Sequence, residues 1–183
     1  MPVLGGIGLV NASSREISLT IIFATLYAVA VVSLAPISFN IYQVRVADAL
    51  LPLSIIFGWP SIIGLTIGAG LANMFGGLGP VDIVGGAAAN FTATLLAWKI
   101  GYRGFTGGWI CAVSVEVLAV TIVVGSYLSI LFDVPLQASI LGVLVGSLIA
   151  IGLLGYLLLR AISTPPMIKT LRSYGITLYV KCE

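Results

Sequence analysis

The chain has 183 residues, of which 60% are hydrophobic and 8% charged, and its mean hydropathy is +1.19. Because a soluble domain typically carries about 25% charged residues, these values exclude a soluble globular protein and predict an integral membrane protein. The formal net charge of +2 is too small to indicate a nucleic-acid partner. Without histidine the chain lacks the commonest general base and metal ligand, and Cys111 and Cys182 match no metal or redox spacing. We therefore expect neither a metal nor a cofactor.

The apolar stretches predict an all-α, polytopic membrane protein with six transmembrane helices. Residues 1–16 are expected to form an irregular lead-in and not a cleavable signal peptide, because the first long apolar run begins only after Glu16. Residues 17–162 would form the transmembrane domain and residues 163–183 a basic cytoplasmic tail. The six helices are expected over residues 17–35, 44–57, 59–75, from the Gly79-Pro80 turn to about Trp98, 106–132 and 136–160.

The second and third of these segments are short for a full crossing, which needs about 20 residues. Pro52 is expected to kink the second segment, and Trp59-Pro60 to begin the third. Either both segments cross as short helices that thin the bilayer locally, or they form a re-entrant hairpin buried in protein. We favour two short crossings.

The basic residues predict the orientation of the chain in the membrane. With six helices, both termini lie on one side, and that side would carry seven of the eight basic residues: Arg15, Lys99, Arg103, Arg160, Lys169, Arg172 and Lys181. The positive-inside rule makes this side the cytoplasm. We expect the membrane to be the plasma membrane. Arg45 is the exception and falls on the outer side, together with Asp48, Asp82 and Asp133.

Polar side chains from different segments converge on that outer side. Charged and amide groups at the ends of apolar helices are costly unless they pair with each other or hold a ligand. Asn90 would lie about 12 Å deeper than Asp82 along the fourth helix, and Glu116 close to the midplane. We predict that these groups line an outward-facing site for a small molecule. The candidate binding residues are Tyr42, Gln43, Arg45, Asp48, Asn73, Asp82, Asn90 and Glu116.

Each of these residues also has a purely structural interpretation. Arg45 and Asp48 are three apart and can neutralise each other. Asp82 can simply stabilise the start of its helix, and Asn73 can cap its helix or bridge to a neighbour. Glu116 is either protonated, paired with Asn90, or facing the ligand.

The first helix carries small residues, Thr20, Ala24 and Ala28, four apart along one face. Small residues at this spacing let two helices approach closely in lipid. The face either packs within the chain or docks another subunit, and the residues alone do not separate the two.

The chain resembles the QueT family at Tyr42-Gln-Val-Arg45-Val-Ala-Asp48-Ala-Leu, where Glu is the expected residue at position 48 and Asp48 is a mild departure. The resemblance continues through Gly64-Leu-Thr-Ile-Gly68, Leu71-Ala-Asn73 and Asp82-Ile-Val-x-Gly86. It covers most of the chain through the fourth helix.

The resemblance implies a substrate-capturing S component of an energy-coupling factor transporter, with queuosine precursors (7-deazaguanine bases) as the proposed cargo. It also implies a six-helix S-component bundle with both termini cytoplasmic. In this family an Ala-rich face of the first helix docks the transmembrane coupling subunit, which favours docking at Ala24 and Ala28. The chain has no phosphate-binding loop, so separate ATPase subunits would supply the energy.

Three other functions compete with this one. The chain can be an S component for another vitamin or small metabolite. A stand-alone channel or secondary transporter is less favoured because the first and last three helices show no repeat. An intramembrane enzyme is least favoured, because no nucleophile lies beside a base.

Overall fold

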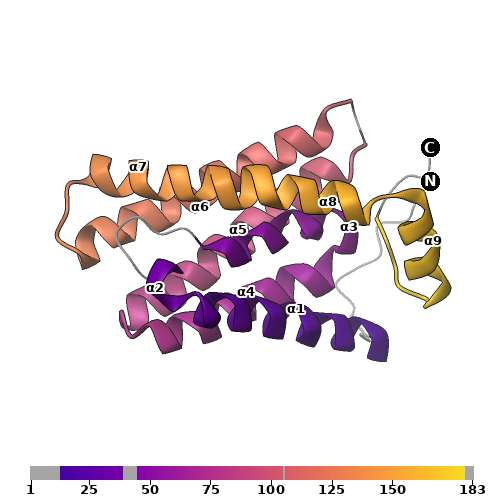
Figure 1. The fold of residues 1–183 in the computed structure, drawn as a ribbon, viewed down its shortest axis with the longest axis horizontal. Helices are drawn as coiled ribbons and strands as arrows, with labels where there is room; N and C mark the ends of the chain where they lie inside the picture. Colours follow the sequence, from indigo (N-terminus) through magenta and orange to yellow (C-terminus); the bar gives the residue numbers. More distant parts are fainter. Residues whose placement is uncertain (1–12, 39–44, 105, 180–183) are drawn as a thin grey trace, which may run out of the picture.

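The computed structural model describes residues 13–38, 45–104 and 106–179. Within these ranges the chain is helical and contains no strand, so the all-α prediction is confirmed. Most helices run along one long axis, and the last helix lies across the end of the bundle (Figure 1). In chain order the elements are α1 (Ser14–Ser33), α2 (Ala35–Ser38), the 3₁₀ helix η1 (Val46–Leu53), α3 (Ser54–Phe57), α4 (Trp59–Gly76), α5 (Pro80–Gly101), α6 (Gly108–Leu131), α7 (Leu136–Ser147), the π-helical segment η2 (Leu148–Gly155), α8 (Tyr156–Ile162) and α9 (Pro165–Ser173).

The first helix begins three residues before the predicted position because its polar lead-in forms a capping box. The Ser13 hydroxyl accepts a hydrogen bond from the Glu16 backbone N–H (3.3 Å), and the Glu16 carboxylate accepts one from the Ser13 N–H (2.9 Å). This reciprocal pair satisfies two backbone donors that a helix start otherwise leaves unpaired. Ser14 to Glu16, assigned to the lead-in from the sequence, therefore belong to α1.

The predicted number of six transmembrane helices is not confirmed. In the described ranges, four helical stretches are long and apolar enough to cross a membrane: Ser14–Ser33, Pro80–Gly101, Gly108–Leu131 and the continuous Leu136–Ile162. The predicted second helix is the shorter pair η1 and α3, whose 12 residues rise only about 22 Å. The third is α4, whose 18 residues are close to the minimum length for a crossing.

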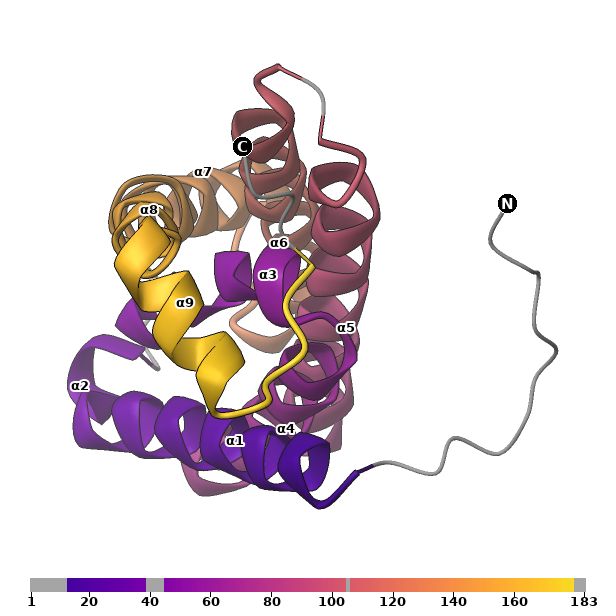
Figure 2. The same ribbon diagram turned by 90° about the vertical axis from the view of Figure 1, so that its right-hand side faces the viewer.

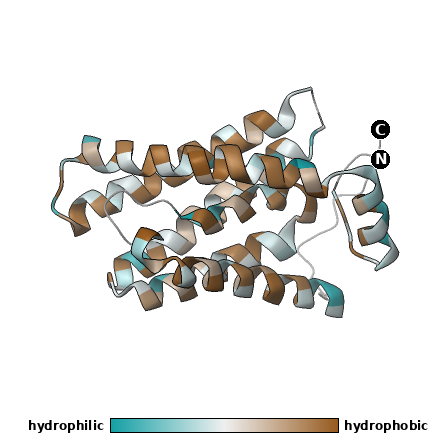
Figure 3. Cartoon of the chain, viewed as in Figure 1, coloured by the Kyte–Doolittle hydropathy of each residue, from teal (hydrophilic) through white to brown (hydrophobic). Residues whose placement is uncertain are grey.

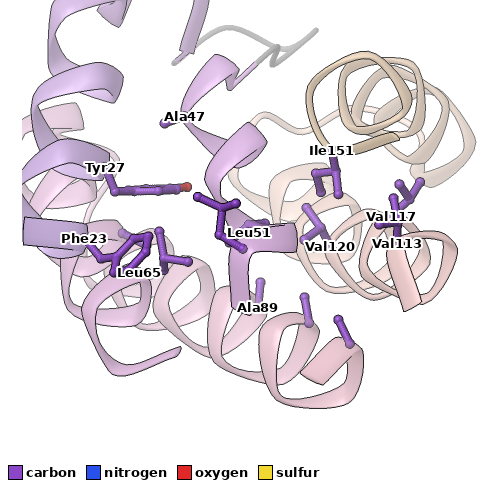
Figure 4. Close-up of a cluster of buried hydrophobic side chains, with 14 of the residues drawn as sticks. Phe23, Tyr27, Ala47, Leu51, Leu65, Ala89, Val113, Val117, Val120 and Ile151 are labelled. Atoms are coloured by element: carbon purple, nitrogen blue, oxygen red, sulfur yellow. The ribbon is translucent and has the colours of Figure 1, made fainter. Parts of the chain in front are cut away.

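The short second segment lies at the centre of the bundle. η1 contacts α1, α4, α5, α6, η2 and α8, and its residues Ala47, Leu51 and Leu53 are buried. Pro52 lies inside η1 and cannot donate a backbone hydrogen bond, which accounts for the irregular helix here. A 3₁₀ segment is tolerated at membrane depth where most of it is buried in protein, and five of the eight residues of η1 are buried. Figure 4 shows Leu51 of η1 between Tyr27 of α1 and Ile151 of η2.

Glycines on α4 allow α1 to approach it closely. A Cβ at Gly64 would lie 2.5 Å from the Thr20 carbonyl oxygen, and one at Gly68 would lie 2.7 Å from the Ala24 carbonyl oxygen. Neither position therefore accepts a larger residue unless the helices separate. The small face of α1 is thus used inside the chain, with Ala24 buried against α4.

Hydrophobic residues predominate along the length of the bundle helices, as the colours of Figure 3 show. Large aliphatic side chains such as Ile21, Ile130 and Leu141 are more than half exposed. Hydrophilic residues concentrate near the ends and on α9. This distribution is the one expected for a bundle surrounded by lipid hydrocarbon.

The end of the bundle that carries α9, which we call the basic end, also carries most of the basic residues. Arg160 and Lys169 lie there beside the turn between α5 and α6, and Arg15 packs against Gly175. Trp98 contacts the rings of Trp59, Tyr102 and Tyr179 at centroid distances of 5.7, 6.3 and 5.3 Å. The predicted tail is therefore partly helical and packs onto the bundle.

Candidate functional site

At the opposite end, polar side chains from five elements meet in the interior. None of them is more than 5% exposed, although they come from distant parts of the sequence. They are Arg45 and Asp48 at the start of η1, Asn73 near the end of α4, Asp82 and Asn90 on α5, Glu116 on α6, and Tyr27 on α1. The sequence-based prediction that these helices bring their polar groups together therefore describes the observed arrangement.

An ion pair joins the start of η1 to the start of α5. Arg45 Nη2 lies 3.6 Å from Asp82 Oδ1, and the Tyr127 hydroxyl of α6 donates a hydrogen bond to the same Oδ1 at 3.0 Å. Asp82 also lies in the first turn of α5, where a carboxylate complements the helix dipole. This position agrees with the structural interpretation of Asp82, and its role as a binding residue stays a prediction.

Asn73 connects α4 to this pair. Its Nδ2 donates to the Asp82 backbone carbonyl at 2.7 Å, so Asn73 bridges two helices and does not cap its own. A Cβ at Gly86 would overlap the Asn73 amide and lie 3.6 Å from Arg45 Nη1. Glycine at position 86 therefore leaves the space that the Asn73 and Arg45 side chains fill.

Asp48 pairs with a residue that the sequence analysis missed. The Tyr27 hydroxyl, fully buried on α1, donates to Asp48 Oδ1 at 2.6 Å. Arg45 forms its direct ion pair with Asp82 on another helix and lines the same cavity as Asp48, so the neutralisation of Arg45 by Asp48 stays a prediction. Figure 4 shows the Tyr27 hydroxyl pointing toward η1.

Glu116 lies deeper, below the ion pair. Its Oε1 accepts a hydrogen bond from Ser54 at 3.4 Å, and the same Ser54 hydroxyl lies 3.2 Å from the Thr94 carbonyl. Asn90 Nδ2 donates instead to the Leu65 carbonyl at 3.3 Å. The alternative in which Glu116 pairs with Asn90 is therefore wrong, and both residues remain within the polar interior.

A small cavity, which we call the polar cavity, lies among these groups. It has a volume of about 10 Å³ and is lined by Arg45, Asp48, Asn90, Val120, Val124, Val143 and Ser147. This space is about the size needed for one water molecule. Its polar wall comes from η1 and α5, and its apolar wall from α6 and α7.

Three buried acceptor atoms of the polar interior, on residues that do not line this cavity, have no hydrogen-bond partner among the residues that the structure describes. They are Asn73 Oδ1, Asp82 Oδ2 and Glu116 Oε2. A buried acceptor without a partner costs free energy, about 1–3 kcal/mol and more when it is charged. The site therefore has unused capacity to accept hydrogen bonds.

Two predicted binding residues, Tyr42 and Gln43, lie outside the described residues. Of the predicted docking residues, Ala24 is buried against α4, whereas Thr20 and Ala28 are partly exposed.

The sequence analysis overlooked Tyr27, Ser54 and the cavity wall on α6 and α7. For Tyr27 a signal was available, because a tyrosine hydroxyl in an apolar helix needs a partner; Val120, Val124 and Val143 carry no such signal.

The comparison with family models decides the family. The model of the QueT transporter family matches residues 17–164, which include every described residue of the site. The chain belongs to the QueT transporter family. It is accordingly a membrane transporter protein and not an enzyme, and the match confirms the resemblance seen in the sequence. No match was found among curated proteins or among solved structures.

Proposed function

We propose that this QueT family protein is the S component of an energy-coupling factor importer and that it binds a queuosine precursor, a 7-deazaguanine base, in the polar interior that contains the polar cavity. The substrate enters from the outer face of the plasma membrane and leaves on the cytoplasmic side, where both termini lie. The observation that carries this proposal is the set of buried acceptors without partners, Asn73 Oδ1, Asp82 Oδ2 and Glu116 Oε2.

These atoms favour a ligand with several hydrogen-bond donors. A deazaguanine presents its ring N1–H and its exocyclic amine side by side, and a carboxylate accepts such a pair of donors. Its carbonyl oxygen needs a donor, which Arg45 supplies from the wall of the cavity. An aminomethyl substituent would be cationic and would favour one of the remaining carboxylates, Asp48 or Glu116. The flat valine wall formed by Val120, Val124 and Val143 suits the face of the ring.

Substrate binding requires the cavity to enlarge, because its 10 Å³ hold no purine-sized molecule. The Arg45–Asp82 ion pair spans η1 and α5, and a ligand that offers donors to Asp82 and an acceptor to Arg45 replaces each half of the pair. Such an exchange limits the desolvation cost, since both buried charges keep a partner throughout.

The direct test is to purify the full chain in detergent and titrate it with a 7-deazaguanine base, with guanine, and with a panel of vitamins, by calorimetry. We expect tight binding of the deazaguanine and weaker binding of guanine. Tight binding of another vitamin, with no affinity for the deazaguanine, would assign a different cargo to the same architecture. Uptake by vesicles that contain this chain alone, without ATPase subunits, would instead indicate a stand-alone transporter.

Assembly with a coupling subunit and ATPase subunits is part of the same proposal, and α1 is the proposed docking helix. Because Ala24 is already buried against α4, we propose that the partly exposed Thr20 and Ala28 form the contact. Ala28→Leu is expected to weaken co-purification with the coupling subunit while ligand binding is unchanged. Ala138→Leu, the same change at an exposed position of α7, is the control and should assemble normally. Equal assembly of both variants would contradict docking at α1.

A further inference from the structure

A second, much larger cavity opens at the basic end, at the opposite end of the bundle from the polar cavity. It has a volume of about 1040 Å³ and lies between the turn that joins α5 to α6, the end of α8, and α9. We call it the basic-end cavity. The side chains that matter for its chemistry are Tyr102, Trp109, Arg160, Lys169, Arg172 and Tyr179.

Helix α9 forms one wall of the cavity, and its start and its buried side are defined by particular residues. Thr164 precedes Pro165 at the first helical position, and Ile168 turns inward and is only 7% exposed. Lys169, next to this buried anchor, faces the cavity. Figure 2 shows α9 lying across the end of the bundle, and the chain after it returning toward α3.

The returning segment is held by a backbone acceptor that the bundle itself cannot satisfy. In a continuous helix the Ile56 carbonyl would accept a hydrogen bond from residue 60, but Pro60 has no N–H. The Tyr179 N–H donates to this carbonyl at 2.9 Å, and the Tyr179 ring packs edge-on against Trp98. These two contacts of Tyr179 therefore fix the position of one side of the cavity.

The charge of this cavity has one sign. Arg160, Lys169 and Arg172 line it, and none of the described residues that line it is acidic. Arg160 and Lys169 are exposed and repel each other, and an anion placed between them relieves this repulsion. Tyr102 and Trp109 are residue types that favour the level of lipid headgroups.

The cavity is also continuous with the lipid-facing surface. Ile110 belongs to its wall and is 59% exposed, and Leu157, 58% exposed, lies one turn before Arg160 on α8. An anion with apolar chains satisfies both surfaces at once, whereas a free phosphate contacts only the cations. We propose that the basic-end cavity binds an anionic phospholipid, with the headgroup phosphate between Arg160 and Lys169 and the acyl chains leaving past Ile110 and Leu157. The inference does not depend on which substrate the polar cavity takes.

The test uses the full chain, purified in detergent and mixed with phosphatidylglycerol or phosphatidylcholine, with bound lipid counted by native mass spectrometry. We expect a discrete phosphatidylglycerol adduct several-fold more abundant than the phosphatidylcholine adduct. In the Arg160→Ala/Lys169→Ala variant, phosphatidylglycerol affinity should fall by about tenfold or more, since each cation near the surface contributes to binding anionic lipid. The matched control is Lys99→Ala/Arg103→Ala, which removes the same charge at the same end from residues outside the cavity wall.

Several results would overturn the proposal. Equal losses in the two double variants would mean that only the diffuse positive charge attracts the lipid. An undiminished adduct in Arg160→Ala/Lys169→Ala would place the lipid elsewhere, and displacement of the lipid by millimolar glycerol phosphate would make this a site for a free anion. If the double alanine variant does not fold, the exposed Lys169→Gln alone serves as the test, with Arg160→Lys/Lys169→Arg expected to retain the adduct.

Discussion

At the scale of single residues, Asp82 is the group on which the proposed site depends most. It is fully buried, pairs with Arg45 and Tyr127 through Oδ1, and holds Oδ2 without a partner among the described residues. Asn has the same shape without the charge. A hydrogen bond to a charged group contributes about 1.5–3 kcal/mol, so Asp82→Asn is expected to weaken deazaguanine binding by roughly ten- to a hundredfold.

Calorimetry of the purified variant measures this change in affinity. Asp133→Asn is the control, because Asp133 is exposed at the same end and its positive φ of 51° is one that asparagine also adopts. Normal binding by Asp82→Asn, with an unchanged thermal unfolding temperature, would mean that the ligand does not contact this carboxylate.

Tyr27 makes a second prediction at the same scale. Tyr27→Phe keeps the buried ring and removes the 2.6 Å hydrogen bond that Asp48 accepts. The Asp48 carboxylate then loses one of its buried partners, and the free energy of unfolding is expected to fall by about 1.5–3 kcal/mol. Thermal unfolding in detergent measures this, with Tyr174→Phe, at a 70% exposed tyrosine, as the control. Equal unfolding temperatures for the two variants would contradict a stabilising role for the Tyr27–Asp48 bond.

The residues of the site differ in the free-energy cost of placing their side chains in lipid. Arg45, Asp48, Asn73, Asp82 and Glu116 were predictable because charged and amide groups in an apolar chain need partners. Their pairing was not predictable, since Arg45 is three residues from Asp48 yet forms its ion pair with Asp82, on another helix. The valines of the cavity wall could not be predicted from the sequence, because valine is equally common against lipid, in a protein core and against a ligand.

At the scale of helices, the glycines of α4 set how closely it packs on α1. Gly68→Ala would place a Cβ 2.7 Å from the Ala24 carbonyl oxygen, and backbone atoms on both helices would have to shift. We expect this variant to unfold at a lower temperature and, because α1 carries Tyr27 and α4 carries Asn73, to bind ligand less tightly.

Gly70→Ala is the matched control on the same helix. A Cβ at Gly70 meets only the Ala87 side chain, at an ordinary 3.8 Å. Since alanine favours helices by up to about 1 kcal/mol over glycine, this variant should be neutral or slightly more stable. A Gly68→Ala variant as stable as Gly70→Ala would show that the α1–α4 contact adapts freely.

Helix type was harder to predict than helix position. Each predicted helical segment coincides with helix in the structure, but residues 46–53 are 3₁₀ and residues 148–155 are π-helical. Pro52 gives a reason for the first. The second has no local marker; η2 packs against η1, with Gly155 close to Pro52, so tertiary contact accompanies the change. Two residues that line the polar cavity belong to or precede these irregular segments, since η1 contains Asp48 and η2 directly follows Ser147.

At the scale of the whole molecule, the two ends of the bundle differ in charge and in packing. The described basic residues other than Arg45 belong to the basic end, where the second cavity and α9 lie, and the buried carboxylates Asp48 and Asp82 belong to the other half. The sequence predicted this separation from the order of apolar runs and charges alone. It could not predict that the tail folds back, because the Tyr179–Ile56 hydrogen bond joins segments more than a hundred residues apart.

This polarity leads to a prediction about the membrane. If the positive-inside rule holds, the basic end faces the cytoplasm and the turn at Asp133 faces outward. In a chain carrying Cys111→Ser and Cys182→Ser, Asp133→Cys should react with a membrane-impermeant maleimide on intact cells. Arg103→Cys should react only after the membrane is opened. Both positions are exposed, so access alone does not separate them. The opposite labelling pattern would show that the protein has the inverse orientation. The polar cavity would then face the cytoplasm, which is incompatible with capture of substrate from outside.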